Sequence, residues 1–102
     1  SKAIEDLDRR LVPSITLTEV FQSVSRQRGE ELALAVFAHM EQGKVVPLDS
    51  ELAIDAASFG LAHKLPLAGS VIYATARKFD ATLWTQDDDF KSLKKVRYYS
   101  KA

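Results

Sequence analysis

The chain has 102 residues, of which 46% are hydrophobic and 27% charged, so residues 1–102 fit a single folded domain rather than a disordered one. Lys and Arg total 14, and so do Asp and Glu, which excludes a large overall positive charge as the basis of nucleic-acid binding. The absence of Cys excludes disulfides and thiolate metal sites. Together with the lack of a signal peptide or a membrane-spanning stretch, it indicates a cytoplasmic protein.

Short β-branched runs alternate with segments of helical periodicity along the chain. We predict strands over residues 12–16, 44–48, 81–85 and 96–99. Helices are predicted from Leu17 to Gly29, over 30–42, from a cap at Asp49 or Ser50 through Leu61, over 69–79, and as a short turn over 90–93. Strands that alternate with helices predict a three-layer α/β/α fold with a mostly parallel sheet.

Acidic residues follow two of the predicted strands. Glu19 lies early in the helix after the first strand, whereas Asp87, Asp88 and Asp89 follow the strand that ends at Thr85. Because the carboxyl ends of parallel strands meet at one edge of a sheet, these carboxylates could face one another. Carboxylate oxygens are the ligands that Mg²⁺ prefers, and bound Mg²⁺ suits phosphodiester cleavage. The sequence therefore predicts a divalent metal site at this edge.

Each acidic group also has an ordinary structural explanation. Thr16 and Glu19 match a capping box, in which the glutamate reaches back to the amide of the cap residue. Asp89 could cap the short helix that begins at Phe90, with the preceding aspartates forming only a turn. Three adjacent carboxylates repel one another unless they are exposed or neutralised by a cation. Both a metal site and a plain turn are consistent with this pattern.

Three segments, in order, resemble the PIN domain family. The sequence T-Q-D-D-D-F at 85–90 resembles the T-x-D-x-D-F signature of PIN domains. The sequence L-P-L-A-G-S-V-I-Y-A-T-A at 65–76 resembles their L-P-x-A-D-x-x-I-x-A-T-A helix. The sequence V-P-S-I-T-L-T-E at 12–19 is similar to the segment that presents the family's conserved glutamate. The resemblance extends from about Val12 to Tyr99 and implies a PIN-like fold.

The resemblance implies a Mg²⁺- or Mn²⁺-dependent endoribonuclease, most like the VapC-type toxins of toxin–antitoxin pairs. By motif, Glu19 and Asp87 would be the catalytic metal ligands, and Asp89 would be a supporting ligand at the rim. Thr85 would brace the acidic turn. The implied partners are an RNA substrate, an antitoxin bound across helical grooves, and a second copy of the chain.

The sequence departs from the family pattern at two places. Gly69 stands where the family's helix has an aspartate; as an N-cap glycine it would keep the helix but remove a charge. Residues before Val12 match the tail of a helical region and not the family's first central strand, so we expect an N-terminally incomplete domain with the middle of its sheet open. A β-plus-helix segment of roughly 30 residues would precede it. We expect impaired activity in this chain, and recovery by Gly69→Asp when the upstream segment is included.

Other functions and roles stay open at this stage. A PIN-like module that has lost hydrolysis but keeps partner binding is favoured by Gly69. A receiver-type signalling domain also places aspartates at strand ends, but lacks the motif of residues 65–76. Four helical residues are consistent with either dimerisation or core packing: Phe21, Val24, Phe37 and Met40. Eight basic residues could form an RNA-contacting rim or simply solvated surface: Arg26, Arg28, Arg77, Lys78, Lys91, Lys94, Lys95 and Arg97.

Overall fold

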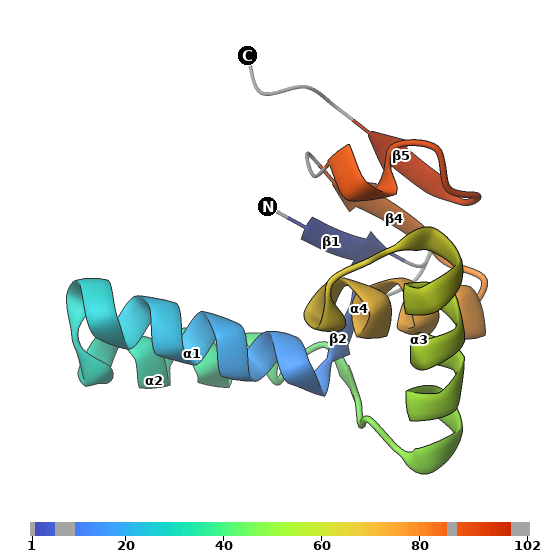
Figure 1. Cartoon of the computed structure of the whole chain (residues 1–102). Helices are drawn as coiled ribbons and strands as arrows, with labels where there is room; N and C mark the ends of the chain where they lie inside the picture. Colours follow the sequence, from blue (N-terminus) through green and yellow to red (C-terminus); the bar gives the residue numbers. More distant parts are fainter. Residues whose placement is uncertain (1, 6–9, 86–87, 99–102) are drawn as a thin grey trace.

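The computed structural model describes the backbone of residues 2–5, 10–85 and 88–98, and the side chains of residues 11–83 and 88–97. Its elements are β1 (Lys2–Glu5), β2 (Arg10–Pro13), α1 (Ser14–Arg28), α2 (Glu30–Met40), β3 (Lys44–Val46), α3 (Ser50–His63), α4 (Leu67–Lys78), β4 (Thr82–Thr85), the 3₁₀-helix η1 (Asp88–Phe90) and β5 (Val96–Tyr98). These short strands and helices form the predicted α/β arrangement (Figure 1). Within these described stretches, no helix combines the length and apolar character needed to cross a membrane.

The strands form one sheet in the order β3-β2-β1-β4-β5. β2 pairs with β3, and β4 with β5, in parallel, whereas β1 is antiparallel to both β2 and β4. All the other described strands therefore run in one direction, and the prediction of a mostly parallel sheet is confirmed. Because β2 and β4 point the same way, their carboxyl ends at Pro13 and Thr85 lie at the same edge of the sheet.

The middle of the sheet is filled by β1, so the predictions of an open centre and of a helical tail before Val12 were wrong. The facing edges of β2 and β4 carry backbone donors and acceptors that an inserted strand satisfies. β1 ends at Glu5 and β2 begins at Arg10, so only residues 6–9 connect them. A parallel pair needs a crossover of about a dozen residues or more, and this short connection therefore imposes the antiparallel direction.

The helices pack on the sheet through α4. This helix contacts β1, β2 and β4 as well as α1 and α3, and as a result residues 69–76 are all buried. α3 packs against α4, while α1 and α2 form a helical hairpin that projects from the sheet beside β2 (Figure 1). The largest fully buried side chains include Leu52, Leu83 and Phe90. Burial of each such side chain contributes about 1.5–3 kcal/mol to folding.

Two helices begin earlier than predicted because each follows a proline. α1 starts at Ser14 with Pro13 at its N-cap (φ −59°), and α4 starts at Leu67 with Pro66 at its N-cap (φ −65°). Proline fixes φ near the helical value, and the amide that it lacks would have no partner at a helix start. Thr16 and Gly69 are each the third residue of their helix, so the predictions that they are N-caps were wrong.

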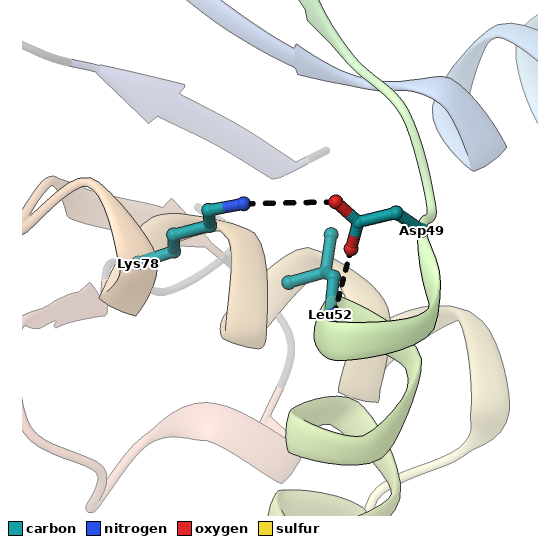
Figure 2. Close-up of polar contacts among 3 residues, drawn as sticks. All are labelled: Asp49, Leu52 and Lys78. Atoms are coloured by element: carbon teal, nitrogen blue, oxygen red, sulfur yellow. Dashed lines mark hydrogen bonds and ion pairs between the residues drawn. The ribbon is translucent and has the colours of Figure 1, made fainter.

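Other helix boundaries were predicted from their capping residues. Gly29 ends α1 with φ at 96°, a conformation that favours glycine, and α2 begins at the next residue. The Asp49 carboxylate is the N-cap of α3 and accepts a hydrogen bond from the Leu52 amide at 2.8 Å. Its other oxygen lies 4.0 Å from Nζ of Lys78 in α4 (Figure 2). These contacts join the first turn of α3 to the last turn of α4.

Candidate functional site

Glu19 lies in the second turn of α1, which begins directly after β2 at the carboxyl edge of the sheet. Its side chain is exposed. α1 has Pro13 at its N-cap and no side-chain capping hydrogen bond, so the capping-box interpretation of Thr16 and Glu19 was wrong. At about 1.5 Å per residue, Glu19 stands roughly 8 Å from the helix start. The carboxylate therefore has no capping role and faces solvent near the edge where β2 ends.

The acidic turn follows β4 at the same edge of the sheet. Asp87, the predicted metal ligand, lies outside the described residues, as does the side chain of Thr85, whose backbone ends β4. Asp88 and Asp89 are exposed and begin η1, in which the Lys91 amide donates to the Asp88 carbonyl at 3.1 Å. Asp89 is the second residue of η1, so the interpretation of Asp89 as the cap of a helix starting at Phe90 was wrong. The described aspartates thus lie on an exposed turn just beyond the carboxyl end of β4.

Gly69 is buried in the first turn of α4, in contact with η1. A Cβ atom built on Gly69 would lie 2.9 Å from Cζ of Phe90 and 3.3 Å from Cγ of Pro66. The first distance is too short for a carbon–carbon contact, so a side chain at this position requires the Phe90 ring to shift. Phe90 is 0% exposed, and a close-packed ring moves only when its neighbours move as well. The Phe90 ring therefore takes part of the space that an aspartate at position 69 needs.

Aromatic side chains hold η1 against the helices. The Tyr73 ring of α4 lies 6.3 Å from Phe90 and 5.0 Å, edge to face, from Phe59 of α3, measured between ring centroids. Its hydroxyl donates to the Lys94 carbonyl at 3.0 Å, in the segment after η1. Burial raises the pKa of Tyr73, and the charge of Arg77 partly opposes this rise. Tyr73 was not predicted to be a functional residue, although its place in the 65–76 motif put it on the helix that faces the acidic turn.

A divalent ion needs oxygen ligands that converge from several elements. Among the side chains of residues 11–83 and 88–97, no three His, Cys, Asp or Glu groups come close enough together to hold a metal ion. Glu19 and Asp89 have the donor type that Mg²⁺ prefers, whereas Gly69 adds no donor. The described carboxylates are therefore the kind of ligand that Mg²⁺ prefers, but too few of them lie together to hold the ion.

All eight basic residues of the predicted rim are exposed: Arg26, Arg28, Arg77, Lys78, Lys91, Lys94, Lys95 and Arg97. Nζ of Lys95 lies 3.4 Å from a carboxylate oxygen of Asp80, and Lys78 pairs with Asp49 as described above. Such surface pairs contribute about 0–1 kcal/mol each. These two lysines therefore form surface ion pairs with aspartates that lie outside the acidic turn.

An apolar groove lies along the α1–α2 hairpin. The family resemblance implied an antitoxin bound across helical grooves, but the position of this groove was not predicted. Its volume is about 510 Å³, and its lining residues are Ser14, Leu17, Thr18, Phe21, Gln22, Leu34 and Phe37. The Phe21 and Phe37 rings pack edge to face with 6.1 Å between their centroids, which joins the two helices. Thr18 lines the groove and directly precedes Glu19 in α1. One end of this apolar surface therefore adjoins the acidic edge of the sheet.

Comparisons with known proteins identify the fold and the family. The family model of the PIN domain matches residues 1–96. Among solved structures, a chain of a toxin-antitoxin complex from Klebsiella pneumoniae aligns with a TM-score of 0.77 at 20% sequence identity, covering 91% of this chain and 77% of that chain. At this identity the similarity demonstrates the fold alone. No curated protein matches the sequence. Because the family model matches almost the entire sequence, the chain belongs to the PIN domain family.

Proposed function

We propose that this chain is the toxin of a toxin–antitoxin pair, a VapC-type PIN domain that acts on RNA in the cytoplasm. The family match and the fold shared with a chain of a toxin-antitoxin complex support this proposal. The observation that carries it is the common direction of β2 and β4 on either side of β1. It brings α1, with Glu19, and the acidic turn after Thr85 to the same edge of the sheet.

The activity that we propose is Mg²⁺- or Mn²⁺-dependent cleavage of an RNA phosphodiester. Glu19, Asp87 and Asp89 would hold the ion, and Thr85 would brace the turn that carries the two aspartates. A bound divalent ion supplies a Lewis acid that polarises a phosphoryl oxygen and neutralises charge that develops on it. The exposed basic side chains near this edge, among them Lys91 and Arg97, would contact RNA phosphates. Since Gly69 supplies no carboxylate, we expect the activity of this chain to be impaired.

The antitoxin would bind in the groove along α1 and α2. Its lining is largely apolar, with Leu17, Phe21, Leu34 and Phe37 joined by a few polar side chains. Leu34 is 55% exposed, so a partner that covers it gains apolar burial. A groove between two helices suits an amphipathic helix with its apolar side chains directed inward. Because Thr18 lines the groove beside Glu19, such a partner would end close to the proposed metal site.

A second candidate function is favoured by one observation, the burial of Gly69 against Phe90. A PIN domain in which Phe90 fills the space beside residue 69 would keep its fold and its groove but would not hydrolyse RNA. It would then serve only to bind a partner. The two candidates differ in what a carboxylate at position 69 would do.

RNA cleavage by wild type, Gly69→Asp and Gly69→Asn separates the candidates. Asp and Asn have nearly the same size, so both displace Phe90 to the same extent and only Asp adds a charge. For the nuclease we expect Gly69→Asp to cleave faster than Gly69→Asn by about 10²-fold, the order of effect seen for one electrostatic group in an active site. EDTA, or Glu19→Gln in the same background, should abolish the gain. A folded Gly69→Asp chain no more active than Gly69→Asn would contradict the nuclease and support the binding module.

A further inference from the structure

Four aromatic rings form a continuous row across α3, α4 and η1. In the order of their contacts they are His63, Phe59, Tyr73 and Phe90. The His63 and Phe59 rings are stacked, with 6.3 Å between their centroids and 17° between their planes. Phe59 meets the Tyr73 ring edge to face at 5.0 Å, and Tyr73 lies 6.3 Å from Phe90. The row therefore connects the last turn of α3 to η1, the short helix of the acidic turn.

Exposure increases along this row from Phe90 to His63. Phe90 is 0% exposed and Tyr73 is 3% exposed, whereas Phe59 is half-buried and His63 is exposed. The inner rings thus join α3, α4 and η1 as part of the core. The His63 ring adds little to that core, but two rings fix its orientation, because Phe59 stacks on it and Tyr73 meets it edge to face at 6.3 Å. The imidazole is therefore a supported aromatic surface that is open to solvent.

Basic residues surround the outer end of the row. Lys64, the C-cap of α3, directly follows His63, and Arg77 lies one turn after Tyr73 in α4. The Tyr73 hydroxyl donates to the Lys94 carbonyl at 3.0 Å, which brings the Lys94 backbone to the row as well. Lys64, Arg77 and Lys94 are all exposed. Exposed aromatic rings beside positive charges are the combination with which proteins bind single-stranded nucleic acids.

We propose that the His63 imidazole is a stacking platform for an unpaired base of the RNA substrate. Lys64, Arg77 and Lys94 would contact the phosphates on either side of that base. An aromatic ring can stack on a base that is splayed out of a loop or a single strand, whereas the bases of a duplex are already stacked on one another. The platform would therefore select single-stranded RNA over double-stranded RNA.

The position of the platform relates it to the acidic turn. The His63 ring is separated from Phe90 by two ring contacts of 6.3 Å each, through Tyr73. Phe90 directly follows Asp88 and Asp89 in η1. A base stacked on His63 would thus hold the adjoining strand near the proposed metal site. This inference rests on the proposed function, because it concerns the RNA on which that function acts.

RNA binding measured by fluorescence anisotropy in EDTA tests the platform without metal or cleavage. The two probes are an oligoadenylate of about eight nucleotides and an abasic strand of the same length, which has the phosphates but no bases. We expect His63→Ala to weaken oligoadenylate binding about tenfold and to leave abasic binding unchanged. His63→Phe keeps an aromatic ring and should bind both strands as the wild type does. Lys64→Ala should weaken both strands by the same factor, because both carry phosphates.

His39→Ala is the matched control, since it removes the chain's other histidine, which is exposed on α2. It should change the binding of neither strand. The platform would be overturned by a His63→Ala chain that binds oligoadenylate as tightly as the wild type or loses affinity for both strands equally. A wild type that binds neither strand, or binds both equally well, would overturn it too. Base-dependent binding by a Gly69→Asp chain that does not cleave RNA would support the platform and contradict only the proposed nuclease.

Discussion

Gly69 and Phe90 are in direct contact: a Cβ atom on Gly69 would lie 2.9 Å from Cζ of Phe90. The contact joins the first turn of α4 to η1, and so it connects residue 69, where the family resemblance predicts an aspartate, to the acidic turn. A side chain at residue 69 therefore displaces Phe90 and with it part of the acidic turn. The cost of that change can be measured separately from its effect on metal binding.

Gly69→Ala should destabilise the chain by about 1 kcal/mol. Displacement of a packed ring costs about 1–3 kcal/mol, and the better helix propensity of alanine returns up to about 1 kcal/mol. Urea unfolding measures the difference. In a Phe90→Leu background the substitution should cost less, since the atom nearest the new methyl group is gone. A Gly69→Ala chain as stable as wild type would mean that the ring shifts freely.

Gly60→Ala should destabilise the chain more, by about 2–3 kcal/mol, because it separates α3 from α4. The added Cβ would lie 2.5 Å from Oγ of Ser70, a buried hydroxyl that donates to the Pro66 carbonyl at 2.9 Å. Removing that hydroxyl leaves Cβ of residue 70 as the nearest atom, at 3.4 Å. Thermal unfolding of Gly60→Ala, Ser70→Ala and the double variant should therefore show that the second change relieves the first. Strictly additive costs would contradict this steric account.

Asp49→Ala should cost about 1 kcal/mol through loss of the N-cap of α3. Asp49→Asn keeps an oxygen that can accept from the Leu52 amide, and it should cost much less. Lys78→Ala should change the free energy of unfolding by less than about 0.5 kcal/mol, because the Lys78–Asp49 pair is exposed and 4.0 Å long. If Lys78→Ala and Asp49→Ala had equal effects in chemical denaturation, the ion pair and not the cap would stabilise the start of α3.

Tyr73→Phe should destabilise the chain by about 1 kcal/mol at neutral pH, since it removes the hydrogen bond to the Lys94 carbonyl. It should also reduce the loss of stability at alkaline pH. Burial raises the pKa of Tyr73 in the folded chain above its usual 10.0, so the folded chain holds this proton more tightly than the unfolded chain does. The stabilisation is complete below pH 10 and is lost as the pH rises through the folded-state pKa. Urea unfolding of both chains between pH 8 and pH 11 measures this, and parallel profiles would contradict it.

Local signals in the sequence predicted much of the fold. Gly29 and Asp49 each set a helix boundary through their own backbone or side chain, and both boundaries were predicted. The starts of α1 and α4 were placed too late, because the caps were assigned to Thr16 and Gly69 and the prolines before them were overlooked. In each of these cases the decisive interaction lies within a few residues.

Features that depend on distant residues could not be predicted in the same way. Lys2–Glu5 has no strong strand pattern, and its β conformation depends on the edges of β2 and β4 that it joins. The contact between Gly69 and Phe90 brings together residues from two elements, and neither segment alone reveals it. The α1–α2 groove likewise exists only when the hairpin forms. The position of Asp87 and its role as a metal ligand stay predictions.

The proposal that residue 69 is a metal-ligand position is tested most directly by calorimetric titration of Mn²⁺ into wild type, Gly69→Asn and Gly69→Asp. We expect Gly69→Asp to bind Mn²⁺ at least about tenfold more tightly than the other two, because one added carboxylate contributes on the order of 1.4 kcal/mol or more to a site of this kind. Asp87→Asn in the Gly69→Asp chain should remove the gain. Equal Mn²⁺ affinity in three folded chains, or binding in none of them, would contradict a PIN metal centre in which residue 69 supplies a ligand.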